Sequence, residues 1–261
     1  MQDARTWEGV RRELPEIVAP AYTADTDGSA AQILERIDAA VDAAAGEEGA
    51  RVASGGPSGS HAAAARAATR RVILVGYSMG GRMAALYALA HPEKLAALVL
   101  ESAGLGCPTE QARESMRKRN ESWAQRCERD FPAFVSWWEK LPLFASQSEL
   151  PEQVRSSQRE MRLSCDPDRL AAQLRLAGQQ TMPLEPDLLE QMARLSLPLH
   201  YIVGTEDEKY LARAQGLPRN FVLHWVRAGH NVHSENSAEY VRILQEIAQD
   251  AAQREPREER Q

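Results

Sequence analysis

Three residue types that can act together in nucleophilic or proton-transfer chemistry occur in the order Ser78, Asp207 and His230. A serine hydroxyl is a weak nucleophile and a weak base by itself. It becomes reactive when a histidine accepts its proton and a carboxylate orients the imidazole. Each of the three residues follows shortly after an apolar stretch that is typical of a buried strand. The sequence therefore predicts a triad at the carboxyl ends of parallel strands.

The serine has the surroundings of a nucleophile elbow. The apolar run Val72 to Val75 precedes the glycine-rich segment 76–81, and a helix-compatible run from Met83 to Ala90 follows it. A strand, a sharp turn and a helix are the context in which such a serine is lifted above the sheet. The glycines remove side chains that would clash in the turn. The Met79 N–H at the start of the helix is then the expected oxyanion donor.

Composition restricts the class of protein. The 261 residues suit one α/β domain with an insertion or two small domains, and the net charge of -6 argues against general nucleic-acid binding. No apolar run is long enough to span a membrane, and residues 1–5 show no apolar signal core. The cysteines at 107, 127 and 165 lack zinc-ligand spacing and suit free thiols. We expect a cytoplasmic protein without metal, cofactor, nucleic-acid partner or membrane partner; the sequence does not specify its oligomeric state.

The chain divides by pattern into an α/β core and an inserted cap. The strand-helix-strand pattern from 71 to 100 predicts parallel strands, whereas the following region is helical, rich in arginine and tryptophan, and without a good strand. Glycine, serine and alanine between 46 and 69 predict a flexible surface insertion. The predicted parts are the first half of the core at 1–104, the helical cap at 105–195, the second half of the core at 196–250 and a charged tail at 251–261.

Local signals predict further elements outside the triad. They are a short amphipathic helix at 5–14, a short strand at 16–22, a helix whose start is marked by Ser29 with Gln32, and a last helix whose start is marked by Asn236 with Glu239.

Other acidic and histidine residues compete for the triad roles. Glu206 and Glu208 flank Asp207, but in a turn their side chains should point elsewhere. His233 follows His230 by three residues and is a candidate for supporting the site or contacting substrate. His224 lies inside a predicted strand, where packing or surface exposure is the simpler interpretation. His61 lies in the predicted insertion, which lacks the packing that fixes a site.

A narrower set of motifs goes beyond the elbow. It consists of Gly76-Tyr77-Ser78-Met79-Gly80-Gly81-Arg82, Trp138 with Pro142-Leu143-Phe144, Arg162, and Ala228-Gly229-His230-Asn231 followed by His233. With these motifs the chain resembles the α/β-hydrolase superfamily and, within it, the 2-succinyl-6-hydroxy-2,4-cyclohexadiene-1-carboxylate synthase family of menaquinone biosynthesis, over about residues 71–248. The resemblance implies an α/β-hydrolase fold, with a mostly parallel sheet, helices on both faces and an inserted helical cap.

The resemblance also implies a lyase. Ser78 would remove a ring proton from a succinyl-enolpyruvyl-cyclohexene carboxylate, pyruvate would leave, and a conjugated diene would remain. By the family pattern Tyr77, Arg82, Trp138 and Arg162 would line the substrate pocket, with either Arg113 or Arg117 as a further cap arginine. Arginine pairs well with carboxylates, and the predicted cap is dense in it despite the acidic chain. The cap arginines are Arg113, Arg117, Arg119, Arg126, Arg155, Arg159 and Arg162.

One departure from the family pattern leaves alternatives open. A His-Gly-Phe type segment, which normally supplies a second oxyanion donor on an early strand, is not found before the helix that contains Trp7. We therefore expect the first strands of the sheet to be missing, and the loss of one donor typically costs about 100- to 1,000-fold in rate. The alternatives are a serine hydrolase on the same fold, such as a carboxylesterase or thioesterase, and an inactive truncated remnant.

Overall fold

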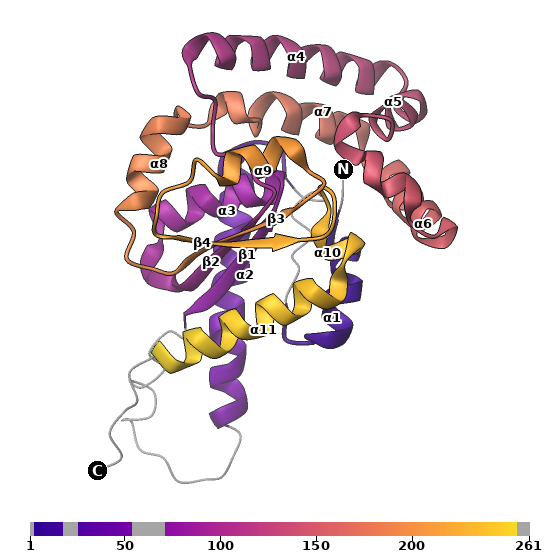
Figure 1. The fold of residues 1–261 in the computed structure, drawn as a ribbon. Helices are drawn as coiled ribbons and strands as arrows, with labels where there is room; N and C mark the ends of the chain where they lie inside the picture. Colours follow the sequence, from indigo (N-terminus) through magenta and orange to yellow (C-terminus); the bar gives the residue numbers. More distant parts are fainter. Residues whose placement is uncertain (1–2, 18–25, 54–70, 255–261) are drawn as a thin grey trace, which may run out of the picture.

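A parallel sheet forms the centre of the protein. The computed structural model describes residues 3–17, 26–53 and 71–254, and within 47–53 only the backbone. In these residues the sheet has four strands in the order β1 (Val72–Tyr77), β2 (Leu95–Glu101), β3 (Leu199–Gly204) and β4 (Phe221–Val226). Figure 1 shows the strands between layers of helices. Every residue of β2 and β3 is buried, which explains their continuous apolar sequences.

The register of the strands brings their carboxyl ends to one edge. Tyr77 of β1 is paired with Glu101 of β2, and Glu101 is paired with Ile202 of β3. Gly204 of β3 is paired with Val226 of β4. The loops that follow β1, β3 and β4 therefore start side by side, which is the edge where open parallel sheets hold their ligands.

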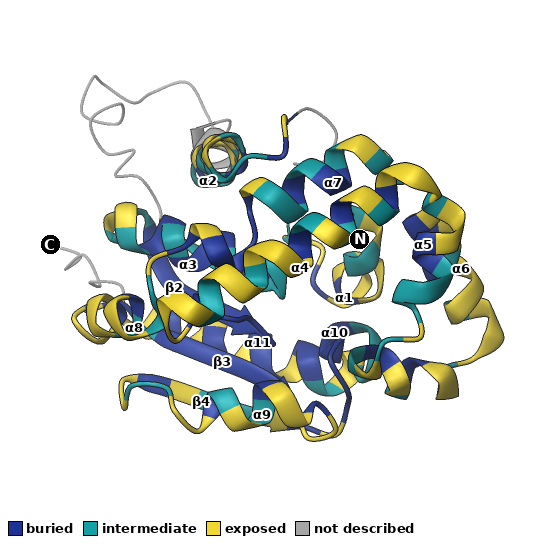
Figure 2. Cartoon of the chain, turned by 90° about the horizontal axis from the view of Figure 1, so that it is seen from above, coloured by how far each residue is buried: buried dark blue, intermediate teal, exposed yellow. Residues whose placement is uncertain are grey.

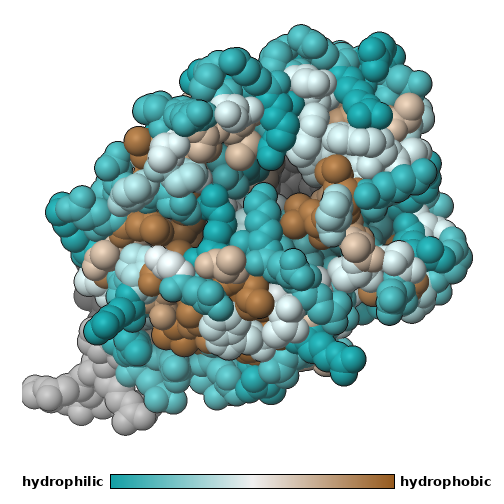
Figure 3. All heavy atoms as spheres, turned by 45° about the horizontal axis from the view of Figure 1, so that its top comes forward, coloured by the Kyte–Doolittle hydropathy of each residue, from teal (hydrophilic) through white to brown (hydrophobic). Residues whose placement is uncertain are grey.

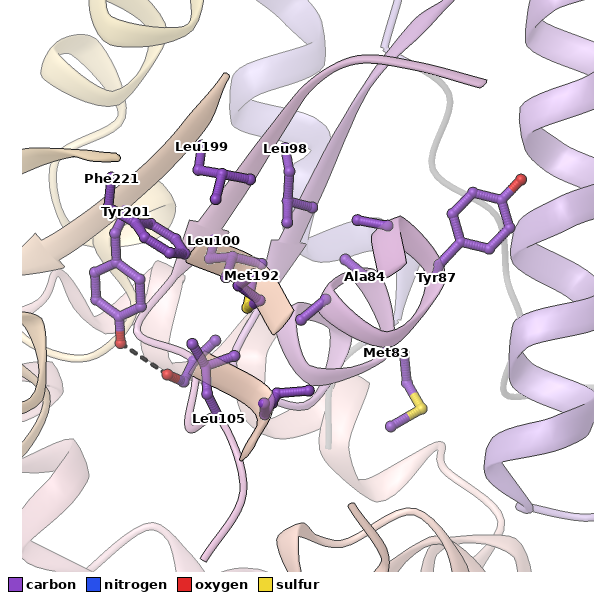
Figure 4. Close-up of a cluster of buried hydrophobic side chains, with 14 of the residues drawn as sticks. Met83, Ala84, Tyr87, Leu98, Leu100, Leu105, Met192, Leu199, Tyr201 and Phe221 are labelled. Carbon is purple, nitrogen blue, oxygen red and sulfur yellow. Dashed lines mark hydrogen bonds between the residues drawn. The ribbon is translucent and has the colours of Figure 1, made fainter. Parts of the chain in front are cut away.

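Helices cover both faces of the sheet and bury two apolar cores. One core contains α2 (Ala30–Ala53) and α3 (Met79–Ala90), together with side chains of α8 (Glu185–Ala193) and α9 (Glu208–Ala214). Part of it appears in Figure 4, where the Tyr201 hydroxyl donates to the Ala103 carbonyl at 2.8 Å. The other core is formed by α1 (Glu8–Glu13) and α11 (Ser237–Arg254). The predicted α/β class, a parallel sheet with helices on both faces, is confirmed.

The segment between β2 and β3 forms a helical cap. It contains α4 (Glu110–Arg129), α5 (Phe131–Trp138), α6 (Glu152–Leu163), α7 (Pro167–Leu176) and then α8, with no strand among them. The α4, α5 and α7 helices are capped by the residues that precede them, Thr109, Asp130 and Asp166, whose side chains accept hydrogen bonds from the first turn. Figures 1 and 2 show α4 and α7 side by side.

The cap side of the surface is mainly hydrophilic. In Figure 3, which brings this side forward, hydrophobic residues gather in patches that border hollows. In the part of the chain that the structure describes, the short helical turns are η1 (Ala4–Trp7), η2 (Pro92–Lys94), η3 (Pro142–Glu149), η4 (Gln179–Thr181) and α10 (Val232–Glu235). Within the described ranges, no helix is long and apolar enough to cross a membrane.

Three predicted boundaries differ from the structure. The strand predicted at 16–22 is absent at Glu16 and Ile17, where the chain turns, and its remainder lies outside the described residues. The α2 helix continues to Ala53, past residue 46 where the insertion was predicted to begin, because its two glycines weaken a long helix without ending it. Residues 54–70, with His61, also lie outside the described part. The α11 helix continues to Arg254, into the predicted tail.

Candidate active site

The elbow positions Ser78 in a strained conformation. Ser78 has φ 49° and ψ −106°, which is unusual for a residue with a side chain. Its N–H donates to the Glu101 carbonyl at 2.8 Å, which ties the turn to the end of β2. The turn is tight: a Cβ on Gly76 would lie 2.6 Å from the Gly81 Cα, and a Cβ on Gly81 would lie 2.5 Å from the Ala103 Cβ. Residues with side chains would not allow this packing.

The three predicted triad residues meet in one hydrogen-bonded chain. The His230 Nε2 lies 3.1 Å from the Ser78 Oγ, and the His230 Nδ1 lies 2.6 Å from the Asp207 Oδ2. Because a carboxylate only accepts hydrogen bonds, Nδ1–H donates to Asp207, which leaves Nε2 free to accept from the serine hydroxyl. Asp207 and His230 are buried, with 4% and 1% of their surface exposed. This geometry is the one that proton removal from a serine requires.

Each triad residue is held by its own element. Asp207 is the N-cap of α9, where its Oδ1 accepts from the Tyr210 N–H at 3.3 Å. His230 follows β4, and Ser78 precedes α3. Met79 is the first residue of α3, so its N–H is among the amide groups that the helix itself does not use. It is therefore available to stabilise negative charge beside Ser78.

Aromatic rings enclose the His230 imidazole. The rings of Tyr210, Tyr77 and Phe144 lie 4.9, 5.3 and 5.9 Å from it, centroid to centroid. Burial raises the pKa of the Tyr77 hydroxyl well above its usual value, and the nearby charges of Glu101 and Glu235 act in the same direction. Tyr77 is thus an uncharged hydroxyl beside the histidine. Phe144 belongs to the cap, so the cap forms one wall of the site.

The competing histidines have other partners. His233 is buried behind the site, where its Nδ1 lies 2.8 Å from the Glu101 Oε2 and its Nε2 lies 2.8 Å from the Thr6 hydroxyl. Its ring stacks on Trp7 at 4.2 Å. His233 therefore supports the site, which is one of the two roles predicted for it. It also joins the N-terminal segment to β2.

The remaining alternatives lie away from the triad chain. The His224 Nε2 lies 3.1 Å from the His200 Nδ1, in a pair between β4 and β3. Glu206 and Glu208 are exposed, as expected for residues that flank Asp207 in a turn. Within the described part of the chain, no group of three or more His, Cys, Asp or Glu residues could hold a metal ion.

The predicted substrate arginines of the cap are engaged within the protein. Arg162 is 5% exposed and donates to Glu139 at 3.0 Å and to Gln147 at 2.8 Å. Its guanidinium lies 5.8 Å from the centre of the Phe144 ring, so it stands one layer behind the wall of the site. Arg113 donates to Glu110 and to the Met182 carbonyl.

Arg117 is the other cap arginine that the sequence left as a candidate. Arg117 is exposed and pairs with Glu114 one turn earlier in α4. The Arg117 side chain is 57% exposed, although it stands three residues before the buried Asn120 on the same helix. The assignment of Arg117 to the substrate pocket therefore finds no support in the packing of α4.

Two other predicted residues lie near the triad or in the cap core. Arg82 is in the first turn of α3, and its backbone N–H donates to the Ser78 carbonyl at 3.2 Å. Trp138 is partly buried and packs against Trp123, Phe134 and Phe144, so it supports the Phe144 wall from behind. Its placement fits the cap-core alternative at least as well as a direct substrate contact.

Sequence reasoning did not single out Arg119. Its guanidinium donates to the Asn120 Oδ1 at 3.0 Å and lies 4.3 Å from the centre of the Trp123 ring. Among the described residues no carboxylate pairs with it. Although the residue as a whole is exposed, burial of the guanidinium lowers the pKa of Arg119, and nearby Tyr210 acts in the opposite direction. The Tyr210 ring packs against the His230 ring at a tilt of 37°. No sequence motif distinguishes Arg119 from its neighbours.

Comparison with known proteins identifies the family of the chain. Residues 60–236 match the hydrolase family described as serine aminopeptidase, S33. The matched region contains all three triad residues and the whole cap. The chain belongs to this α/β-hydrolase family.

Individual relatives carry more specific names than the family does. A Salmonella paratyphi B protein named 2-succinyl-6-hydroxy-2,4-cyclohexadiene-1-carboxylate synthase is 36% identical over 177 residues, which cover 67% of each chain. A Bacillus subtilis protein that carries this name provisionally is 36% identical over 182 residues, which cover 68% of this chain and 65% of that protein. The aligned region thus spans about two thirds of these relatives.

Solved structures resemble the protein over nearly its whole length. The structure of MenH from S. aureus has a TM-score of 0.79 at 25% identity, covering 96% of this chain and 91% of that one. A thermophilic esterase from Thermogutta terrifontis has a TM-score of 0.70 at 22% identity, covering 96% and 86%. The second likeness concerns the fold alone.

Proposed function

We propose that the protein is a carbon-oxygen lyase that eliminates pyruvate from a succinyl-enolpyruvyl-cyclohexene carboxylate to give 2-succinyl-6-hydroxy-2,4-cyclohexadiene-1-carboxylate, a step of menaquinone biosynthesis. The observation that carries the proposal is the Ser78–His230–Asp207 hydrogen-bonded chain of this protein, and the name of relatives at 36% identity supports it. The proposed activity requires a base and a site for negative charge, and the protein offers Ser78 and the Met79 N–H for these two roles.

In the proposed reaction Ser78 acts as a base and not as a nucleophile. His230 accepts the serine proton, and the serine oxygen removes a proton from the ring. The electron pair of that C–H bond moves into the ring, the C–O bond to the enolpyruvyl group breaks, and the leaving group takes up a proton to become pyruvate. The Met79 N–H stabilises negative charge that develops on the substrate. No covalent acyl-enzyme forms.

The substrate of this reaction is a polyanion, and Arg119 is suited to bind it. A guanidinium binds a carboxylate through two parallel hydrogen bonds. Among the described residues Arg119 has only neutral partners, which are the Asn120 amide, the Trp123 ring and the Met116 sulfur, and it is partly desolvated. The Asn120 amide is fixed in turn by the Gln180 Oε1 at 2.8 Å. Arg119 is thus held in place without a carboxylate partner among the described residues, and Tyr210 is near enough to act on its pKa. We assign it the cap role that sequence reasoning gave to Arg113 or Arg117.

A serine hydrolase is the second candidate, because the same triad geometry serves acyl transfer and the matched family is described by a peptidase name. Two assays separate the candidates. The lyase should release pyruvate from the cyclohexene substrate while leaving p-nitrophenyl acetate largely intact. Rapid release of p-nitrophenol, without any pyruvate, would favour the hydrolase. Reaction with an organophosphonate is expected for both, because it tests only the activated serine.

A further inference from the structure

Glu235 lies in α10, five residues after His230, and its carboxylate holds the loop that carries the histidine. The Gly229 N–H donates to the Glu235 Oε2 at 2.6 Å, and the Asn231 N–H donates to the Glu235 Oε1 at 3.1 Å. These two amides belong to the residues immediately before and after His230. One carboxylate therefore fixes the backbone on both sides of the imidazole.

The backbone around His230 is closely packed. A Cβ on Gly229 would lie 1.9 Å from the Ser146 Oγ and 2.8 Å from the Glu235 Oε2. The cap and the carboxylate thus approach the backbone as closely as a glycine allows. Asn231 and His230 are buried, so their backbone groups depend on partners within the protein.

The charge of Glu235 is also felt inside the site. It contributes to the raised pKa of Tyr77, after burial and the charge of Glu101. Tyr77 lies 5.3 Å from the His230 ring, centroid to centroid. Glu235 is therefore close to the site without touching Ser78 or the Nε2 of His230.

We propose that Glu235 is a positioning residue for His230: its carboxylate clamps the Gly229 and Asn231 N–H groups so that the imidazole meets both Ser78 and Asp207. The proposal rests on the proposed triad chemistry, although it does not depend on which substrate is used. Hydrogen bonds from N–H groups to a carboxylate are stronger than neutral ones. A glutamine in this place would present one oxygen and one NH₂ group, so one of the two amides would face a donor instead of an acceptor.

The test is the rate at which a fluorophosphonate labels Ser78 in the full chain. We expect Glu235→Gln to label about 10- to 100-fold more slowly than wild type, since a misplacement of about 1 Å costs this order in rate. Glu235→Asp keeps the charge but reaches only one amide, so its rate should fall between the two. The matched control is Glu239→Gln, whose carboxylate pairs with Arg242 on the exposed side of α11 and should label at the wild-type rate.

A second readout separates positioning from general stability. The proton NMR signal of the His230 Nδ1–H, bonded to Asp207, should shift or broaden in Glu235→Gln and Glu235→Asp and remain unchanged in Glu239→Gln. Folded Glu235→Gln that labels at the wild-type rate, with an unchanged proton signal, would overturn the proposal. If that variant does not fold, the same result for Glu235→Asp would overturn it.

The outcomes also distinguish this proposal from the proposed function. A wild-type chain that labels but releases no pyruvate would refute the lyase and leave the clamp intact. A wild-type chain that does not label would refute the triad and the clamp with it. Slow labelling by Glu235→Gln beside normal labelling by Glu239→Gln would support the clamp in either case.

Discussion

Neutralising Arg119 is the most informative change in the cap. Arg119 and Arg117 lie two residues apart on α4, yet Arg117 is exposed and pairs with Glu114, whereas Arg119 has a partly buried guanidinium and no carboxylate partner among the described residues. The variants Arg119→Gln and Arg117→Gln therefore remove the same charge from the same helix. Only the first removes a group that we assign to the substrate.

The expected size of the effect follows from the contact that is lost. A hydrogen bond to a charged group contributes roughly 1.5 to 3 kcal/mol, and each 1.4 kcal/mol or so corresponds to about tenfold in an equilibrium constant. We expect Arg119→Gln to raise the KM for the cyclohexene substrate about 10- to 100-fold, with a smaller effect on kcat. Arg117→Gln should change KM by less than about twofold, as exposed ion pairs contribute little.

The assay follows the conjugated diene product by its ultraviolet absorbance over a range of substrate concentrations. Fluorophosphonate labelling of Ser78 in both variants checks that the triad is intact, and we expect wild-type rates in each. An unchanged KM for Arg119→Gln would refute the assignment. Equal losses in the two variants would show that the overall charge of α4 matters and not the position of Arg119.

Three further predictions concern stability. His233→Ala removes the ring partner of the buried Glu101 carboxylate and should lower the free energy of unfolding by roughly 1 to 3 kcal/mol in urea titrations; wild-type stability would contradict the supporting role of His233. Gly81→Ala should cost about 1 to 3 kcal/mol in thermal denaturation because its Cβ would meet Ala103, and an unchanged Tm would contradict the tight elbow. Burial lowers the pKa of His200 from 6.5 to about 4, so between these pH values the unfolded chain binds more protons than the folded one. The free energy of unfolding should therefore fall as the pH drops from 6.5 to about 4. His200→Gln should flatten this pH dependence, and an equally steep pH dependence in the variant would contradict the role of His200.

The elements around the elbow could be predicted from the sequence because their signals are local. The run Val72 to Val75 predicts β1, the glycines predict the turn, and the order Ser78, Asp207, His230 predicts the triad that the hydrogen bonds bring together. The carboxyl ends of parallel strands lie on one edge of the sheet, so residues that follow these ends are expected to lie near each other.

The roles of the cap arginines could not be predicted in the same way. Arg113, Arg117 and Arg119 look alike in sequence, and only the packing of α4 on α7 decides which of them faces solvent and which loses water. The Glu235 clamp depends on the conformation of the 229–231 loop, and the motif around His230 does not by itself show that Glu235 accepts from both flanking N–H groups. The end of α2 was missed because propensity is a weak guide where a helix passes through glycines.

The most direct test of the central claim is pyruvate release from the succinyl-enolpyruvyl-cyclohexene substrate, measured by a coupled assay with the purified chain and with Ser78→Ala. The account predicts one pyruvate for each diene formed by the wild-type chain, and a rate that falls by at least about 1,000-fold in Ser78→Ala, as for removal of a triad member. Pyruvate release that persists in Ser78→Ala, or a wild-type chain that hydrolyses esters and releases none, would contradict it.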